Sequence, residues 1–212
     1  DYEQTAYYDA IIEGYKKVNP NVTIETIDLG SSDYSNMLQT QLAGGSDFDV
    51  VTIKEIPGYG NLVAQGLLGP LDDFIAEEGI DTSLYGGTTE QVTVDNHHPA
   101  GVEPGTTLGS ITGLALNKNA TNKAAALDFI KWVTGEAGAK EIAKTGTIPA
   151  IHTEAVMEEI ADMDGFPQDQ NSKEALSTKQ IYLDMPFNIK AGEVEIVMNE
   201  EQTEIMSGTK TI

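Results

Sequence analysis

The 212-residue sequence contains no cysteine, one tryptophan, and only 12 lysine and arginine residues against 34 acidic ones. Without cysteine, the protein has no disulfide framework, no thiolate catalysis and no cysteine-based zinc site. A formal net charge of −22 argues against binding to nucleic acid, because release of counterions from phosphates needs clustered basic residues. The simplest interpretation of this acidity is a well-solvated surface.

Long apolar runs are also absent, since none approaches the ~20 residues that a membrane-spanning helix needs. The chain begins at Asp1 without a methionine or a signal peptide, so we expect a processed or trimmed chain whose export signal or lipid anchor lay upstream. No phosphate-binding glycine loop, dinucleotide fingerprint, serine-hydrolase elbow or calcium loop occurs. The composition, 40% apolar, is that of a globular protein with one large domain or two small ones.

The most informative stretch is M-L-Q-T-Q-L-A-G-G-S-D-F-D-V-V-T-I-K-E, residues 37–55. It has the pattern of a helix end, a Gly-Gly turn and then an unbroken apolar run, Asp49 to Ile53. Such a run predicts a strand buried on both faces, as in a parallel sheet. Because ligands of open parallel sheets bind beyond the carboxyl ends of the strands, we expect the functional site around Lys54, Glu55 and Ile56.

Periodicity and turn signals predict an α/β first half with right-handed crossovers, followed by a helical and acidic last third. The helices are expected over 4–18, 33–42, 57–66, 67–75, 122–134, 136–144, 153–161, 173–183 and 192–206, and the strands over 22–29, 49–53, 91–94 and 111–116. Residues 96–109 show no periodicity and are rich in proline and glycine, which marks a domain boundary or crossing point.

Several ordered blocks resemble a known family. They are N-P-N-V at 19–22, Q-T-Q-L-A-G-G-S-D-F-D-V-V at 39–51, L-V-A-Q-G-L-L-G-P-L-D-D-F-I at 62–75, G-S-I-T-G-L-A-L-N-K-N at 109–119 and A-A-L-D-F-I-K-W-V-T-G-E at 125–136. Together they resemble the extracellular solute-binding proteins of carbohydrate ABC importers, and in particular the maltose-binding-protein-like group. The match spans nearly the whole chain, and the order of the blocks is more specific than any one of them.

The resemblance implies a periplasmic-binding-protein-like α/β lobe with a parallel-type sheet flanked by helices, plus C-terminal helices. Residues 1–96 would form the first part of this lobe, residues 97–150 the return segment that completes it, and residues 151–212 a helical segment near the hinge and the second lobe. Because V-D-N at 94–96 runs directly into the return segment, we expect most of the second lobe to be missing between Asn96 and His97. The family's first strand and last helix are missing as well.

The function implied is that of a non-enzymatic substrate-binding component, which captures a sugar outside the membrane and delivers it to an ABC permease without a cofactor. Its place would be extracellular or periplasmic, held by a lipidated N-terminus not present in this chain. The alternative is a truncated lobe acting as a protein–protein interaction or self-association module without sugar binding. A glycan hydrolase would need opposed carboxylates, whereas the neighbours Asp72-Asp73 and Glu77-Glu78 point apart on a helix and indicate a solvated face.

The residues expected to bind the sugar lie at the strand ends. Lys54 and Glu55 can form charge-assisted hydrogen bonds with sugar hydroxyls, although an ordinary solvated strand end has the same pattern. Gly109, Ser110 and Ile111 lie at a matching strand entrance, where glycine lets backbone amides approach a ligand; the alternative is a tight turn. The resemblance adds Glu3, beside the start of the first helix.

An aromatic ring can pack on the apolar face of a sugar. Phe187 is placed on a loop and is the preferred candidate, ahead of Tyr59 and Tyr85. Trp132 lies in an amphipathic helix, which favours core packing over ligand stacking. The three histidines, His97, His98 and His152, lack the spacing of a helical metal pair, so we expect neither a metal site nor a catalytic base among them.

Overall fold

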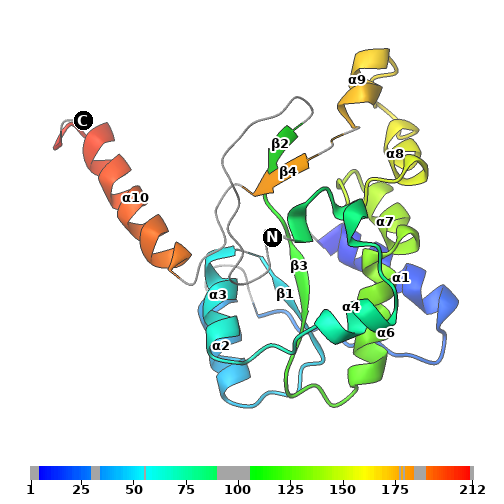
Figure 1. The fold of residues 1–212 in the computed structure, drawn as a ribbon, viewed down its shortest axis with the longest axis horizontal. Coiled ribbons are helices and arrows are strands. Elements are labelled where there is room, and N and C mark those ends of the chain that lie inside the picture. Colours follow the sequence, from blue (N-terminus) through cyan, green and yellow to red (C-terminus); the bar gives the residue numbers. More distant parts are fainter. Residues whose placement is uncertain are drawn as a thin grey trace.

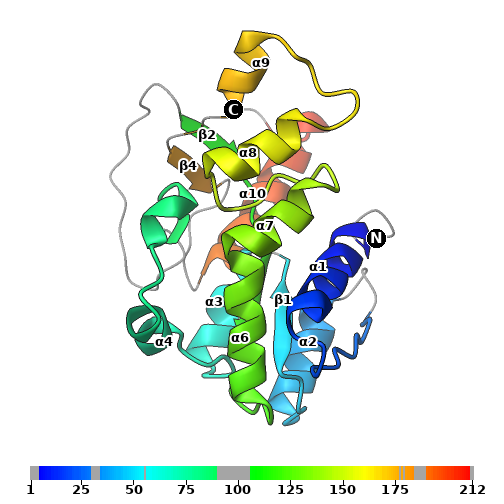
Figure 2. The same cartoon turned by 90° about the vertical axis from the view of Figure 1, so that its right-hand side faces the viewer.

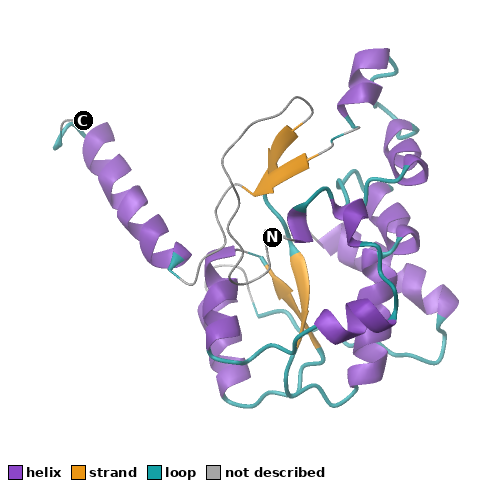
Figure 3. Cartoon of the chain, in the orientation of Figure 1, coloured by secondary structure: helices purple, strands orange, loops and turns teal. Residues whose placement is uncertain are grey.

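The computed structural model describes residues 5–29, 34–54, 56–89, 106–176, 178, 180–183 and 190–210. Its elements are mostly helices, with a few short strands between them (Figure 3). The helices are α1 (Thr5–Val18), α2 (Tyr34–Ala43), α3 (Ile56–Ala64), α4 (Asp72–Glu77), η2 (a 3-10 helix, Thr82–Tyr85), α6 (Lys123–Thr134), α7 (Glu136–Ala143), α8 (Glu154–Ala161), α9 (Gln170–Ala175) and α10 (Ala191–Met206). The strands are β1 (Val50–Ile53), β2 (Thr106–Gly109), β3 (Gly113–Leu116) and β4 (Gln180–Leu183).

The strand β1 pairs with β3 in a two-stranded sheet of the described residues, and the two run antiparallel, with Val50 opposite Leu116 and Ile53 opposite Gly113. The prediction of a parallel neighbour for this strand is therefore wrong. An unbroken apolar run reports only that both faces of a strand are covered, whereas the direction of the neighbouring strand depends on how the chain returns to it. A parallel pair is formed elsewhere, between β2 and β4.

Burial of β1 and β3 on both faces is confirmed, because alternate residues contribute to two different clusters. Val51 and Ala115 pack with Leu38, Leu42 and Leu62 of α2 and α3. Leu116 packs on the opposite side with residues of α6 and its leading turn, namely Ala120, Ala126 and Ile130, and Val50 and Leu114 join this second cluster. Figure 2 shows α6 in front of the strands, with α2 and α3 behind.

A helical layer is built from α1, α6, α7 and α8, each in contact with the next along the layer. Ile11 and Tyr15 of α1 are buried. The ring of Tyr15 meets that of Trp132 edge to face, with centroids 5.6 Å apart. Trp132 also covers Gly14, where a Cβ would come within 2.7 Å of the indole ring. This tryptophan therefore packs between helices, as the sequence predicted.

Two predicted elements are wrong, and the strands β2 and β4 were not predicted. Residues 22–29 form no strand, and Ile27 is 58% exposed, because an extended segment becomes a strand only where a partner pairs with it. The helix expected over 173–183 is divided into α9 and β4. The strand β2 lies within the aperiodic segment. The strand expected over 91–94 lies outside the described residues.

Most other predicted helices are confirmed within a few residues. The helix expected from residue 67 begins later, at Asp72, because Leu68 instead forms an isolated bridge with Asn117. None of the helices in the described part of the chain is long and apolar enough to cross a membrane. The last helix, α10, projects from the body of the molecule (Figure 1) and contacts α3.

Candidate functional site

The sequence placed the site where β1 ends, and the pairing of β1 with β3 defines what meets there. Ile53, the last residue of β1, lies opposite Gly113, the first residue of β3. Lys54 therefore leaves the ladder at the same end at which Ser110, Ile111 and Thr112 enter it. The two predicted groups share one edge of the sheet, although the strands run in opposite directions.

Three tyrosines gather at this edge from two helices. Tyr7 and Tyr8 lie near the amino-terminal end of α1, and their ring centroids are 4.2 Å apart. The Tyr8 hydroxyl donates a hydrogen bond to Oγ1 of Thr52 at 3.1 Å, and the Tyr34 hydroxyl donates to the Thr52 carbonyl oxygen at 2.8 Å. Thr52 in β1 thus holds both helices against the strand just before the strand ends.

Lys54 adds a positively charged side chain to this group of tyrosines. Its Nζ lies 5.0 Å from the centre of the Tyr34 ring, within the range of a cation–π contact. The side chain is half-buried. We refer to Tyr7, Tyr8, Tyr34, Thr52 and Lys54 together as the tyrosine cluster.

The side chains of the tyrosine cluster are partly buried, and this burial shifts the pKa values of their phenols. Burial is the main cause that raises the pKa of Tyr34 to about 12, with a smaller rise from Tyr8, and the hydrogen bond to Thr52 acts in the opposite direction. Burial also raises the pKa of Tyr7, helped by Tyr8 and opposed by the Thr112 hydroxyl. These phenols therefore stay neutral at any physiological pH and act as hydrogen-bonding groups.

Of the other predicted site residues, some lie beside the tyrosine cluster, one belongs to a different strand, and the rest fall outside the described residues. Ser110 is exposed and Ile111 half-buried beside the cluster. Gly109 instead belongs to β2, where a Cβ would come within 3.1 Å of Ile181, so close packing accounts for the glycine. Glu3, Glu55 and Phe187 lie outside the described residues, and their contact with a sugar stays a prediction.

The two further aromatic candidates are not loop platforms. Tyr59 lies within α3, and its half-buried phenol has a pKa raised mainly by burial. Tyr85 ends η2 and donates a hydrogen bond from its hydroxyl to the Thr134 carbonyl oxygen at 3.0 Å. It packs against the cluster around Ile151 and Val156, so the Tyr85 ring serves the fold.

Sequence reasoning missed Tyr7, Tyr8 and Tyr34. Tyr8 was read only as part of the apolar face of α1, because its spacing to Ile11, Ile12 and Tyr15 satisfies the helical period. A usable signal was present: two adjacent tyrosines in the first turns of a helix whose start was already expected beside the site. Side chains that are neighbours in a helix point in different directions, so an aromatic pair cannot serve one apolar stripe alone.

The histidines and the acidic pairs near α4, which could suggest metal binding or catalysis, are not part of the tyrosine cluster. In the described ranges, no group of three or more histidine, aspartate or glutamate side chains could hold a metal ion. His97 and His98 lie outside these ranges. His152 is half-buried beside the cluster around Ile151, and Asp72, Asp73, Glu77 and Glu78 are exposed on or just after α4, as expected of a solvated face.

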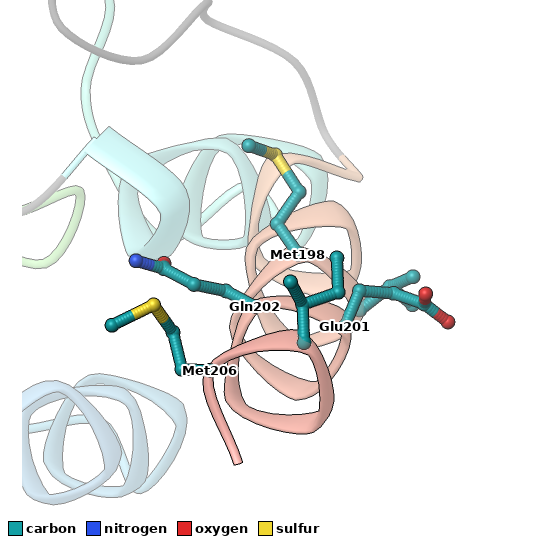
Figure 4. Close-up of a pocket in the computed structure, with 6 residues that line it drawn as sticks. Met198, Glu201, Gln202 and Met206 are labelled. Atoms are coloured by element: carbon teal, nitrogen blue, oxygen red, sulfur yellow. The ribbon is translucent and has the colours of Figure 1, made fainter. Parts of the chain in front are cut away.

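A hollow along α10 differs in character from the tyrosine cluster. It measures about 370 Å³ and is lined by Val197, Met198, Glu201, Gln202, Ile205 and Met206, all from this one helix. Figure 4 shows Met198, Gln202 and Met206 on one side of the helix and Glu201 pointing away on the other. An open apolar strip with few polar groups does not suit a sugar, whose hydroxyls need partners.

Comparison with known proteins relates part of this chain to a family. Residues 2–94 match the model of the bacterial extracellular solute-binding proteins. The structure is similar to that of a sugar transporter from Rhizobium etli solved in an open conformation, with a TM-score of 0.85, 27% identity, and coverage of 100% of this chain and 94% of that one. No curated protein matches the sequence significantly.

A second solved structure supports the fold. An ABC substrate-binding protein from Listeria monocytogenes, in complex with cycloalternan, has a TM-score of 0.70 and 12% identity, with coverage of 97% of this chain and 91% of that one. The resemblance to solute-binding proteins of sugar ABC importers is confirmed, and so is the periplasmic-binding-protein-like α/β fold. The matched family consists of extracellular binding proteins and not of enzymes.

Proposed function

We propose that this chain, similar as it is to extracellular solute-binding proteins, captures a sugar or oligosaccharide outside the membrane for delivery to an ABC permease. One observation carries the proposal: the tyrosine cluster and the Ser110–Thr112 segment meet at the end of the β1–β3 ladder. The similarity to the Rhizobium etli sugar transporter supports the class of ligand. Anchoring through a lipidated N-terminus, as the family resemblance implies, belongs to the same proposal.

The chemistry of the tyrosine cluster suits a neutral, polyhydroxylated ligand. Tyrosine rings offer faces for the apolar side of a sugar ring, and their hydroxyls donate and accept hydrogen bonds. Lys54 adds three donors at the edge of the cluster. Ser110 and Thr112 are exposed at the same edge and bring hydroxyl groups from the opposite strand.

Delivery would work through a population shift. A sugar that bridges two lobes favours the closed form, because it makes contacts there that the open form lacks. A single lobe supplies only half of these contacts. We therefore expect weak binding by this chain alone, with a dissociation constant of about 1 mM, which corresponds to only ~4 kcal/mol of binding free energy.

Titration of the ¹⁵N-labelled chain with a panel of oligosaccharides tests the proposal. Amide shifts should move around Lys54 and Ser110–Thr112 and not at Lys118, which lies beyond the other end of β3. Replacing Tyr8→Leu should weaken binding about tenfold through loss of the ring face, and Tyr8→Phe should weaken it less. Lys118→Met is the matched control and should leave the affinity unchanged. Submicromolar affinity would contradict the single-lobe expectation, and shifts confined to α10 would place the ligand elsewhere.

The alternative, a self-association module, would use the exposed apolar side chains of α10. Val194, Ile196, Val197, Met198 and Met206 are each at least half exposed, at 51–80%. The known proteins to which the chain is similar lend this alternative no support, and we do not propose it as a second function.

A further inference from the structure

Among the lysines for which the described residues show no ion pair, Lys54 is half-buried, whereas the others are exposed. The chain has 34 acidic residues, and Lys131, Lys140, Lys144 and Lys210 each form an ion pair with a glutamate. Lys54 forms none within the residues that the structure describes, although it is half-buried. In a chain of net charge −22, a half-buried ammonium-bearing side chain with no carboxylate partner in the described part of the candidate site is a specific arrangement.

The groups that the structure places around Lys54 are neutral. The Tyr34 ring lies 5.0 Å from its Nζ, and the hydroxyls of Tyr8 and Tyr34 are both engaged with Thr52. A cation–π contact compensates only part of the hydration that a half-buried ammonium loses, about 0.5–2 kcal/mol. The tyrosine cluster thus fixes the position of a positive charge, and the described residues around it supply no anion, which is the strongest partner that a ligand could offer.

We propose that the ligand is an acidic saccharide, a sugar whose carboxylate pairs with Lys54 while its hydroxyls and ring face contact the tyrosine cluster. This inference rests on the proposed function and adds the class of sugar to it. The negative field of the whole chain opposes an anion at long range, but salt screens it over about 8 Å at physiological ionic strength. A direct ammonium–carboxylate contact is shorter than that distance and therefore dominates.

The experiment compares matched sugars that differ only in the acidic group. Amide shifts of the ¹⁵N-labelled full chain are followed on titration with galacturonate against galactose, glucuronate against glucose, and the corresponding disaccharides. Glucose 6-phosphate is included, because a phosphate ester offers Lys54 the same kind of partner. The variants are Lys54→Met, Lys54→Arg and, as the control, Lys118→Met, an exposed lysine beyond the other end of the strand pair.

We expect each uronate to bind about tenfold more tightly than its neutral partner, as for one charge-assisted hydrogen bond. Lys54→Met should abolish this preference, whereas Lys54→Arg and Lys118→Met should keep it. A preference for glucose 6-phosphate over both uronates would overturn the assignment to a carboxylate.

Two other results would also overturn the inference, and they differ in what they say about sugar capture. If neutral sugars bind as tightly as acidic ones, or if Lys54→Met weakens both alike, the acidic class is wrong and sugar capture stands. If no sugar moves any amide at this edge, sugar capture at the tyrosine cluster fails, and the acidic class fails with it.

Discussion

Asn117 has no exposed surface. It directly follows β3, and its side chain forms hydrogen bonds with backbone groups at the end of the β1–β3 ladder that lies away from Lys54. Its Nδ2 donates to the Ser46 carbonyl oxygen at 2.8 Å, and its Oδ1 accepts from the Asn119 amide at 3.1 Å. Asp49 accepts from Asn122 nearby. Side-chain amides hold this end through hydrogen bonds, and the tyrosine cluster holds the other end, where Ser110 and Thr112 are exposed.

At the scale of single residues, His152 should make stability depend on pH. Burial lowers the pKa of His152 below its ordinary value of 6.5, against the opposing effect of the Thr178 and Pro149 backbone. In the unfolded chain the imidazole takes up a proton as the pH falls through about 6.5, whereas the folded form does so only at lower pH. Folding should therefore lose stability between these two pKa values and be unaffected by His152 above them.

Urea unfolding of the wild type and of His152→Gln between neutral pH and pH 5 measures this effect. The difference in unfolding free energy between the two should change with pH by at most ~1.4 kcal/mol per unit, the value for a whole proton. Parallel pH profiles for the two proteins would contradict the assignment.

At the scale of elements, the packing of α1 against α6 and α7 depends on the fact that residue 14 is a glycine and has no side chain. Gly14 lies under the indole ring of Trp132, and a Cβ there would come within 2.7 Å of Cη2 and 2.8 Å of Cγ of Glu141. Glu141 can move, because it ends in a flexible chain toward solvent. The indole is fixed between helices, so the helix spacing is set by this glycine and this ring.

Gly14→Ala should therefore destabilise the protein by about 1–3 kcal/mol through overpacking, despite the gain of about 1 kcal/mol in helix propensity. Unfolding in urea measures the loss. In a Trp132→Phe background the smaller ring leaves room for the methyl group, and the same substitution should cost less. Equal costs in both backgrounds would show that the ring and the glycine are not coupled.

At the scale of the whole molecule, the net charge of −22 means that like charges oppose compaction. Few ion pairs offset this: the described residues contain them at Lys131, Lys140, Lys144 and Lys210, all solvent-accessible. Such pairs contribute little each, typically up to about 1 kcal/mol.

Raising the sodium chloride concentration should accordingly stabilise the fold, since screening weakens the repulsion more than it weakens a few surface pairs. We expect the melting temperature in calorimetry to rise by about 2–5 °C between low salt and ~0.5 M. Sodium sulfate is a poor comparison because it also strengthens apolar burial, whereas tetramethylammonium chloride is a suitable control for a purely ionic effect. A melting temperature that falls with sodium chloride would mean that the ion pairs outweigh the repulsion.

Much of the fold was predictable because its signals are local. The helical period in α1, the Gly-Gly turn before β1 and the apolar run of the strand each lie within one short window of sequence. Part of the candidate site could be predicted for the same reason, since Lys54 directly follows that run. Residues 22–29 were wrongly assigned, since an alternating pattern indicates a strand only if a partner exists. Tyr34 was missed because nothing within its own helix points to Lys54.

By itself, the sequence determined which segments are helical, that the central strand is covered on both faces, and which family the chain resembles. These follow from side-chain periodicity and residue order, which are properties of the chain alone. Only the tertiary structure decided that β3 returns antiparallel to β1 and that Tyr7, Tyr8 and Tyr34 converge on Thr52 and Lys54. Strand direction and convergence arise from contacts between residues far apart in sequence, and no local pattern of residues encodes them.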